Sequence, residues 1–500
     1  MNNQLTRLAL VAVLLLVALI VATTYWQAWD AGSLAARQDN NIQLVSQFEV
    51  SRGLILASNG KTVIAANTKK RKSGQTFYFR RYPLGGFAAQ TVGYSTSALS
   101  QTGLEESLDG YLTGATTNLS NAIQRTLDRL GGGTVYGDNV VLTINAQAQQ
   151  LAQQLLGNRC GAVVAMNPRT GAILTMASSP TYNQNLILEP GGYAKILKIK
   201  GACGDSSALV NLATNGLFTP GSTFKMVTAA AALDSGAFKP TSTFFDPGYC
   251  TEYGKRVSNA LNPDQRGAES YGNVTLAQGL EHSINSVFCN VGKAIGGEEI
   301  LKYAKRFGFY STPPLETPAN QRIPSGLYHY VKNRLVLWDP KNENDIDPGR
   351  LAFGQFNMVA TPLQMLLVGA TIANGGMVPR PYIVDKIIGH DGSVVSRTRA
   401  TNMGRAIKPE TAAELTQMMT SVVQAGTGTA AQIPGIEVAG KTGTAETGIN
   451  NVYTAWFVCF APANNPQVAV AVVLSKQANG FGGSVSAPIA KQILEKLLHR

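Results

Sequence analysis

Residues 218–233 contain a serine and a lysine, Ser222 and Lys225, whose spacing could support nucleophilic chemistry. Pro220 and Gly221 break the backbone just before Ser222, and the alanine-rich run that follows favours a helix, so Ser222 should lie in a first helical turn. A separation of three residues then puts the hydroxyl and the ammonium group on one face. A serine becomes a nucleophile when a neighbouring base takes its proton, and a lysine is such a base when its neutral form is accessible. We therefore interpret the pair as a candidate nucleophile and base.

The Ser-x-x-Lys pattern carries little weight alone, because it also occurs at residues 58–61, in a glycine-containing turn without a helix to align it. Two further patterns occur once each downstream, Ser-Ile-Asn at residues 283–285 and Lys-Thr-Gly-Thr at residues 441–444. Taken singly, the first is typical of a helix cap or turn, and the second is typical of a surface turn. Their order after Ser222 indicates one site assembled from three segments.

The order of these three patterns resembles that of the penicillin-recognising serine acyltransferases. Two phrases nearer the N-terminus, Ser-Arg-Gly-Leu-Ile at residues 51–55 and Gly-Leu-Glu at residues 103–105, resemble signatures of class B penicillin-binding proteins. The resemblance implies an α+β fold of the β-lactamase/transpeptidase type, with an antiparallel sheet and a helical subdomain, preceded by a non-catalytic pedestal module. Taken alone, Glu105 would be interpreted as a surface carboxylate or a salt-bridge partner.

The resemblance also implies a role for each residue of the first two patterns. Ser222 would be the nucleophile and Lys225 its base, with the neighbouring charge of Lys441 favouring the neutral form of Lys225. Ser283 would relay a proton to the departing amine. Asn285 would hold the substrate amide or anchor Lys225.

Substrate binding is assigned by the same resemblance to the third pattern, which we expect on a strand at a sheet edge. The hydroxyls of Thr442 and Thr444, with the charge of Lys441, would bind a terminal carboxylate. Gly443 would let the substrate backbone approach closely. The backbone N–H groups of Ser222 and Thr444 would form the oxyanion hole, in which losing one donor typically costs about 3 kcal/mol of barrier.

Class B members of this family are peptidoglycan D,D-transpeptidases, and the resemblance implies the same activity here. The serine would attack the D-Ala-D-Ala end of a stem peptide, release D-alanine and pass the acyl group to an acceptor amine; β-lactams would acylate the same serine. The sequence leaves open a D,D-carboxypeptidase, which uses the same residues with water, and a non-enzymatic penicillin-binding sensor or scaffold. A serine β-lactamase also stays open, with Glu316 and Asn320 in Glu-x-x-x-Asn spacing as the candidate for deacylation.

A membrane anchor is predicted near the N-terminus. Residues 8–26 form a run without a charged side chain, long enough to span a bilayer. Because Arg7 precedes the run, the positive-inside rule predicts a single-pass protein of the bacterial cytoplasmic membrane with its catalytic part outside the cytoplasm. A cleaved signal peptide is the alternative, since Ser-Leu-Ala at residues 33–35 suits a cleavage site. The layout implies a separate membrane glycosyltransferase of the SEDS type as partner.

Composition and cysteine usage narrow the possibilities further. With 44% hydrophobic and 14% charged residues, the chain is an ordinary globular protein. The net charge is +12, and the densest run of positive residues is at 69–72. This run is interpreted either as a solvated loop or as a site that attracts anionic lipid or cell-wall polymer. No nucleic-acid-binding pattern accompanies it. The spacing of the cysteines and histidines supports neither a metal site nor a Cys/His dyad, and no cofactor is expected.

Disulfides are permitted in an exported chain. We expect a Cys250–Cys289 bridge, because the two residues flank the segment that leads into Ser283. Cys160 with Cys203 is a second candidate pair. Cys459 lies in an apolar strand-like run and is expected to be a buried thiol.

Strand and helix patterns divide the chain into three expected parts: a tail and anchor at 1–30, the pedestal at 31–138 and the transpeptidase domain at 139–500. Gly-Gly-Gly at residues 131–133 reads as a flexible joint. Within the last part, strands early and late in the sequence should pair in one sheet, with helices between them. The expected strands are 139–144, 161–166, 172–177, 436–445, 453–460 and 467–474, and the expected helices are 146–156, 361–374, 409–424 and 487–498.

Overall fold

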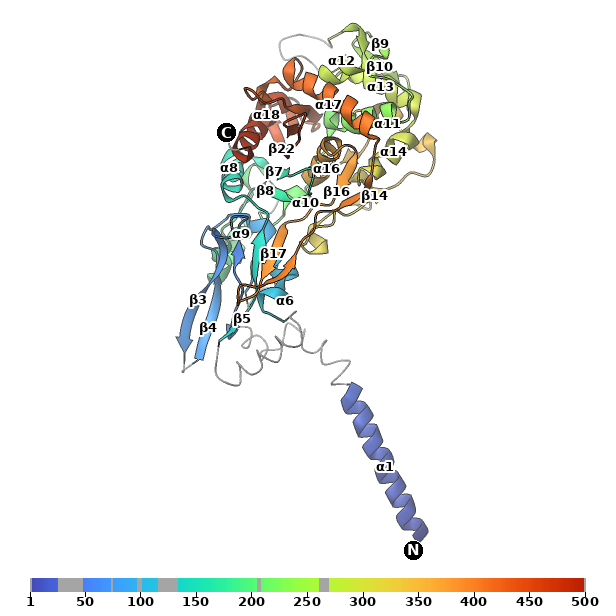
Figure 1. Ribbon diagram of the computed structural model, residues 1–500. Helices are drawn as coiled ribbons and strands as arrows, with labels where there is room; N and C mark the ends of the chain where they lie inside the picture. The colour runs from blue at the N-terminus through green and yellow to red at the C-terminus, as the bar shows by residue number, and fades with distance from the viewer. Residues whose placement is uncertain are drawn as a thin grey trace.

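The computed structural model describes residues 2–25, 48–72, 75–96, 101–115, 134–204, 208–259 and 269–498. The predicted joint at 131–133 and the possible cleavage site at 33–35 lie outside these residues. Figure 1 shows three parts in a row: the long helix α1, a slender sheet module, and a larger mixed module at the far end. Helix α1 spans Asn2–Tyr25, and its segment Thr6–Tyr25 has a mean hydropathy of 2.7, so it is long and apolar enough to cross a membrane.

A five-stranded antiparallel sheet forms the centre of the larger module. Its strands are β7 (Cys160–Met166), β8 (Ile173–Ser179), β20 (Ala439–Glu446), β21 (Val452–Ala461) and β22 (Val468–Ala478), in the order β20-β21-β22-β7-β8. Strand β22 pairs with β7, so early and late segments share one sheet, as predicted. Strand β20, which carries the Lys-Thr-Gly-Thr pattern, lies at the edge of this sheet.

Helices cover both faces of this sheet. Helices α8 (Ala146–Leu156) and α18 (Ala487–Leu497) pack on one face, and α16 (Pro362–Ala373) packs on the other, with α17 (Pro409–Gln424) beside it. Helix α16 starts where the Thr361 hydroxyl accepts a hydrogen bond from the N–H of Gln364, with proline in the first turn. Eleven of its twelve residues are buried, because it lies between the sheet and the surrounding helices. These four helices lie within a residue or two of their predicted bounds.

A helical subdomain beside the sheet carries the Ser-Ile-Asn pattern. Its helices are α11 (Lys225–Asp234), α12 (Leu276–Glu281), α13 (Asn285–Ile295) and α14 (Gly297–Arg306), with α15 (Pro348–Leu351) packed on α13. Two short hairpin-like pairs cover it, β9 (Thr243–Asp246) with β12 (Gly272–Thr275) and β10 (Tyr249–Glu252) with β11 (Lys255–Ser258). The Cys250–Cys289 disulfide joins β10 to α13, and Cys160–Cys203 closes a second bridge. Cys459 is a buried free thiol, as predicted.

The pedestal is a six-stranded sheet drawn from both halves of the chain. Its strands are β2 (Ile55–Leu56), β3 (Val63–Lys72), β4 (Gln75–Arg81), β6 (Asn139–Leu142), β17 (Val384–Ile388) and β18 (Val394–Arg397), in the order β18-β17-β6-β2-β3-β4. Strands β6, β17 and β18 all come from the part of the sequence expected to form the transpeptidase domain. The strand predicted at 139–144 therefore lies in the pedestal sheet and not in the central one, because β6 pairs with β2 and β17. The basic run at residues 69–72 forms the outer end of strand β3 rather than a loop.

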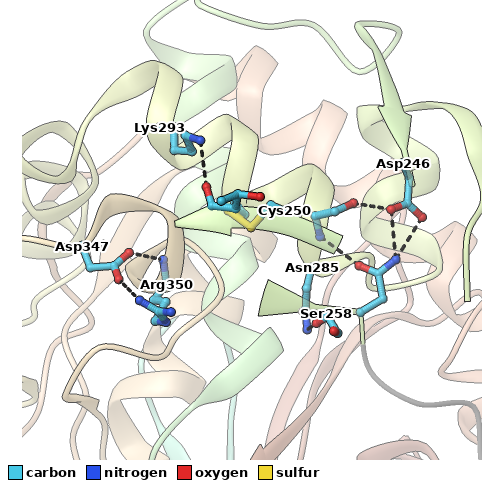
Figure 2. The surroundings of a disulfide bond; sticks show 11 residues. Asp246, Cys250, Ser258, Asn285, Lys293, Asp347 and Arg350 are labelled. Atoms are coloured by element: carbon cyan, nitrogen blue, oxygen red, sulfur yellow. Dashed lines mark hydrogen bonds and ion pairs between the residues drawn. A yellow bond between two sulfur atoms is a disulfide. The ribbon is translucent and has the colours of Figure 1, made fainter. Parts of the chain in front are cut away.

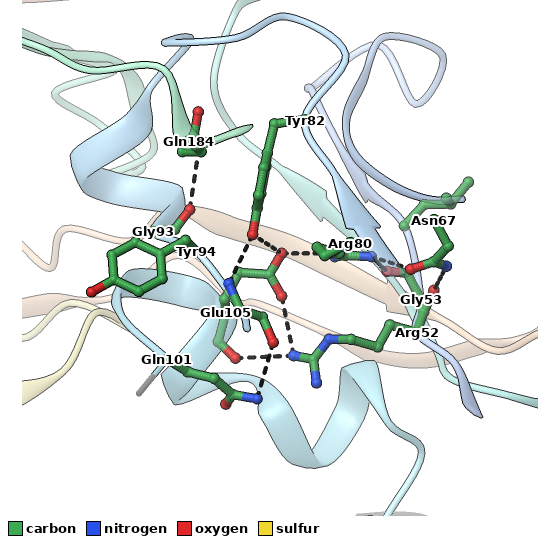
Figure 3. Close-up of polar contacts among 12 residues, drawn as sticks. Arg52, Gly53, Asn67, Arg80, Tyr82, Gly93, Tyr94, Gln101, Glu105 and Gln184 are labelled. Atoms are coloured by element: carbon green, nitrogen blue, oxygen red, sulfur yellow. Dashed lines mark hydrogen bonds and ion pairs between the residues drawn. The ribbon is translucent and has the colours of Figure 1, made fainter. Parts of the chain in front are cut away.

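A buried ion cluster joins the two signature phrases of the pedestal. Glu105 is fully buried and pairs with Arg52 at 3.1 Å and with Arg80 at 2.5 Å (Figure 3). Tyr82 donates its hydroxyl hydrogen to the same carboxylate, and Asp109 takes the other side of Arg52 at 2.6 Å. The surface interpretation of Glu105 is therefore wrong, because two buried arginines from other segments need its charge; the salt-bridge interpretation is right.

Shorter elements complete the fold. In the pedestal and its junction these are β1 (Val50–Ser51), α4 (Ala89–Val92), α5 (Gly103–Ser107), α6 (Asp109–Leu112), β5 (Val135–Tyr136), α9 (Gly192–Leu197) and α10 (Leu212–Asn215). Later in the chain are β13 (Gly326–Val331), β14 (Arg334–Trp338), β15 (Met358–Val359), β16 (Met377–Pro379) and β19 (Asn402–Arg405).

Candidate active site

Ser222 lies in a tight turn that leads into helix α11. The turn, Gly221–Phe224, is 3₁₀ rather than α-helical, so Ser222 sits just before the helix whose first residue is Lys225. Gly221 has φ +51°, and a Cβ there would lie 3.1 Å from the carbonyl oxygen of Thr444. Strand β21 holds the approach to this turn, because Trp456 donates its indole N–H to the Thr219 carbonyl at 3.0 Å. Ser222 is half-buried, and the turn that carries it packs against β20 and α11.

The ammonium group of Lys225 is fully buried among neutral acceptors. Its Nζ donates to the Ser283 carbonyl at 2.6 Å and to Asn285 Oδ1 at 2.8 Å, and Ser283 Oγ is 3.4 Å away. The ring centre of Phe288 lies 5.4 Å from Lys225 Nζ. Burial, reinforced by the charge of Lys441, holds the pKa of Lys225 well below its usual value.

A second buried lysine meets the same serine from the sheet. Lys441 Nζ donates to Ser283 Oγ at 2.8 Å and to the Thr442 carbonyl at 3.0 Å. Burial lowers the pKa of Lys441 to about 7. Ser283 itself has φ +59°, a left-handed conformation that costs energy for a non-glycine residue and is found most often at functional sites.

Strand β20 presents its hydroxyls beside this cluster. Thr442 Oγ1 lies 2.6 Å from Thr427 Oγ1, and Thr444 Oγ1 accepts a hydrogen bond from the N–H of Gly482 at 3.3 Å. The structure gives a reason for glycine at position 443 that the sequence did not indicate. A Cβ at this position would lie 2.8 Å from the Pro220 carbonyl oxygen. Glycine is thus required for β20 to pack against the serine turn, whatever approaches from outside.

The three predicted segments therefore meet in one place. Ser283 bridges the two lysines, Asn285 holds Lys225, and β20 packs directly on the Ser222 turn. Glu316 lies elsewhere, because its carboxylate accepts from the N–H groups of Ile383 and Val384 beside the pedestal sheet. Among the described residues, no group of three metal-ligating side chains occurs.

Sequence reasoning missed a buried carboxylate that supports the Ser-Ile-Asn segment. Asp246 is fully buried, accepts from the Ser286 hydroxyl at 2.5 Å, and accepts from Asn259 Nδ2 at 2.9 and 3.1 Å (Figure 2). Asn259 Oδ1 in turn accepts from the N–H of Ser286 at 3.0 Å. The neighbouring carbonyl, that of Ser258, accepts from Asn285 Nδ2 at 3.1 Å.

These contacts determine which end of the Asn285 amide faces Lys225. Because the amide nitrogen is held by the Ser258 carbonyl, the amide oxygen is directed at the lysine. Asp246 belongs to β9 and Asn259 follows β11, so no spacing in the sequence links either residue to residues 283–285.

Comparison with known proteins gives the family. Residues 161–495 match the penicillin-binding protein transpeptidase domain, and residues 52–140 match the penicillin-binding protein A dimerisation domain. The chain is 32% identical to the peptidoglycan D,D-transpeptidases PbpA of Mycolicibacterium smegmatis and of Mycobacterium tuberculosis, covering all of this chain and 99% of each relative. Within class B, the sequence motifs favour a resemblance to penicillin-binding protein A of actinobacteria. The two mycobacterial PbpA relatives confirm this resemblance.

Solved structures agree with the sequence comparison. The ceftriaxone acyl-enzyme complex of penicillin-binding protein A from M. tuberculosis superimposes with a TM-score of 0.77 at 30% identity, over 90% of this chain and 99% of that one. The D,D-transpeptidase domain of a peptidoglycan glycosyltransferase from Eggerthella lenta gives 0.74 at 33% identity, over 90% of this chain and 99% of that one. With its α+β fold and converging motifs, the chain belongs to the penicillin-binding protein transpeptidase family.

Proposed function

We propose that this chain cross-links peptidoglycan as a D,D-transpeptidase with Ser222 as nucleophile. The observation that carries the proposal is the pair of fully buried lysines joined through Ser283, with neutral oxygens rather than carboxylates as their partners among the described residues. Such an environment favours neutral amines, and a neutral lysine beside a serine is the base that acyl transfer needs.

The hydrogen bonds of Lys225 leave one direction for Ser222. A neutral amine has two N–H bonds and one lone pair, and the two N–H bonds are taken by the Ser283 carbonyl and Asn285 Oδ1. The lone pair then serves the hydroxyl of Ser222, three residues earlier. As Ser222 Oγ attacks the carbonyl carbon of the penultimate D-Ala, its proton passes to Lys225 Nζ.

Ser283 can return that proton to the leaving group. Its Oγ accepts from Lys441, which frees its own hydrogen for the nitrogen of the departing D-alanine while Lys225, 3.4 Å away, replaces it. The C–N bond breaks and an ester to Ser222 remains. An acceptor amine then attacks this ester, loses its proton along the same route, and restores the serine hydroxyl.

Strand β20 is the proposed binding edge. The N–H groups of Ser222 and Thr444 would receive the oxyanion. Because Thr444 Oγ1 accepts from Gly482, its hydroxyl hydrogen remains available for the terminal carboxylate, together with Thr442 and with Lys441 while it carries its proton. Gly443 keeps this edge close to the nucleophile.

The relatives support the acyl-enzyme step, since penicillin-binding protein A from M. tuberculosis has been solved as acyl-enzyme complexes with ceftriaxone, imipenem and penicillin G. β-Lactams would acylate Ser222 here in the same way. The position of Glu316 at the pedestal disfavours a β-lactamase, and the intact lysine pair disfavours a scaffold. A D,D-carboxypeptidase would use the same residues with water as the acceptor.

Membrane placement and partners are part of the proposal. Helix α1 would be a retained single-pass anchor, with Arg7 on the cytoplasmic side and the catalytic module outside. The divisions 1–30, 31–138 and 139–500 serve as anchor, pedestal and transpeptidase domain, although β6, β17 and β18 from the last part contribute to the pedestal sheet. A SEDS-type membrane glycosyltransferase would supply the glycan strands.

A substitution at the nucleophile tests the site. We expect Ser222→Ala to abolish covalent labelling by fluorescent penicillin, whereas Ser58→Ala, in the other Ser-x-x-Lys pattern, labels normally. Labelling that survives Ser222→Ala would show that another residue is the nucleophile. Mass spectrometry of products from a lipid-linked substrate and its polymerase then separates cross-linked dimers from trimmed monomers, the product of a carboxypeptidase.

A further inference from the structure

The outer half of strands β3 and β4 forms a two-stranded projection, which we name the basic hairpin (residues 69–72 and 75–78). Strand β2 pairs with β3 only at Ile55 and Leu56, opposite Ala65 and Val63, whereas β3 and β4 stay paired as far as Lys72 and Gln75. The basic hairpin therefore extends beyond the pedestal sheet, and Figure 1 shows it directed away from the catalytic module.

Positive charge on the basic hairpin is uncompensated. Lys69, Lys70, Arg71 and Lys72 are all exposed, and none of the ion pairs among the described residues involves them. The sequence contains no Asp or Glu between Glu49 and Glu105. Glu105 is already taken by the buried arginines, so among the described residues no carboxylate forms an ion pair with the four cations.

Aromatic rings lie beneath these cations. Lys69 Nζ is 5.8 Å from the ring centre of Tyr78, and Lys70 Nζ is 5.3 Å from that of Phe79. The two ammonium groups thus lie over aromatic faces while their side chains stay exposed, a combination of charge and aromatic surface that suits the boundary between headgroups and solvent.

The basic hairpin also lies where the chain joins the body. Phe48, the first described residue after α1, packs its ring on Phe79 of β4 with centroids 5.1 Å apart. The segment that follows the apolar helix therefore reaches the body at this hairpin. In Figure 1, α1 and the basic hairpin lie toward the same end of the molecule.

We propose that the basic hairpin docks on anionic lipid headgroups of the membrane that holds α1. The proposal rests on the proposed membrane anchoring and adds a second contact that would limit the tilt of the pedestal and the height of Ser222 above the bilayer. Each Lys or Arg close to an anionic surface strengthens binding about fivefold, and the attraction decays within a Debye length of roughly 8 Å at physiological salt.

The test uses the full chain in lipid nanodiscs, with a fluorophore on Gln75→Cys at the exposed end of the basic hairpin and a spin label on the lipid headgroups. We expect strong quenching in discs containing phosphatidylglycerol, and at least tenfold weaker quenching in purely zwitterionic discs or at high salt. Arg71→Gln with Lys72→Gln should remove most of the quenching. Lys332→Gln with Arg334→Gln, which removes two exposed cations from the β13–β14 hairpin, should not.

The possible outcomes are distinguishable. Quenching that ignores lipid charge, or that the Arg71/Lys72 pair leaves intact, overturns the proposal, as does a hairpin that binds purified peptidoglycan but not anionic discs. A chain that does not remain with the discs contradicts the anchoring itself, and the docking proposal falls with it. Penicillin labelling of Ser222 should be unchanged in all these variants, because the basic hairpin is not part of the catalytic cluster.

Discussion

The pedestal and the active site both bury two cations, but they treat the charge in opposite ways. In the pedestal, Arg52 and Arg80 share the carboxylate of Glu105. Burial alone would lower the pKa of Arg52, yet the charges of Glu105 and Asp109 outweigh it and raise the pKa above its usual value. This cluster ties three segments of the pedestal together.

In the active site, Lys225 and Lys441 share a serine. Ser283, Asn285 and the Thr442 carbonyl are neutral acceptors, so burial is not offset and the pKa of both lysines falls. Lysine can lose its proton under these conditions, whereas arginine cannot. The comparison teaches that the partner of a buried cation, a carboxylate or a neutral oxygen, decides whether the cation serves structure or chemistry.

The largest expected effect comes from removing the proposed base. We expect Lys225→Met to lower the rate constant for acylation by fluorescent penicillin by about 10³-fold, a typical contribution of a general base. The melting temperature should fall only slightly, because an apolar side chain of similar length fills the site while the Ser283 carbonyl and Asn285 Oδ1 lose a donor. Acylation at the wild-type rate would exclude Lys225 as the base.

The matching change in the pedestal should affect stability instead. We expect Glu105→Gln to destabilise the fold by about 3–5 kcal/mol, because Arg52 and Arg80 lose their buried counter-charge. Acylation per folded molecule should stay at the wild-type rate. Denaturant unfolding measures the effect, and Glu106→Gln, at the exposed neighbouring position, is the control. Equal stability of the two variants would contradict the structural role of Glu105.

A smaller effect is expected from the support of Asn285. Asp246→Asn should lower the acylation rate about tenfold, or about 1.4 kcal/mol of barrier. Without the carboxylate, Asn259 is held less firmly, so the neighbouring Ser258 carbonyl no longer fixes the Asn285 amide. The amide then no longer orients Lys225, whose lone pair must point at Ser222. The pH profile of acylation should move as well. Asp347→Asn, which alters another buried carboxylate near the same disulfide, is the control (Figure 2). An identical profile in both variants would reduce Asp246 to a purely structural residue.

The last expected effect is a gradual change of stability with pH, at most about 1.4 kcal/mol for each unit. The pKa of Lys441 is about 7 in the folded chain and about 10.4 when unfolded, so between these values the unfolded chain binds more protons. The free energy of unfolding should therefore rise with pH across this window, by at most about 1.4 kcal/mol per unit for this lysine, and this gain should be lost as pH falls toward 7. Unfolding curves of Lys441→Met should show a flatter slope than those of Glu105→Gln. Equal slopes would mean that Lys441 keeps its proton when folded.

Much of the fold could be predicted locally. The helices around the central sheet follow from proline and threonine near their starts and from apolar periodicity, and strands β21 and β22 contain long apolar runs. The sharing of one sheet by early and late strands, seen in the pairing of β22 with β7, was predictable because strand patterns occur at both ends of the same module. The strands β17 and β18 were not predicted, because an exposed strand such as β18 has no apolar signature and its partners come from the pedestal.

The sequence alone predicts which residues would carry the chemistry, since hydroxyl, amine and amide groups at fixed spacings belong to the covalent chain. Only the tertiary structure decided how those groups behave. The low pKa values of Lys225 and Lys441, the orientation of Asn285 by Asp246, and the burial of Glu105 all depend on segments far apart in sequence. The physical reason is that desolvation and charge coupling depend on distance in space, which spacing along the chain does not determine.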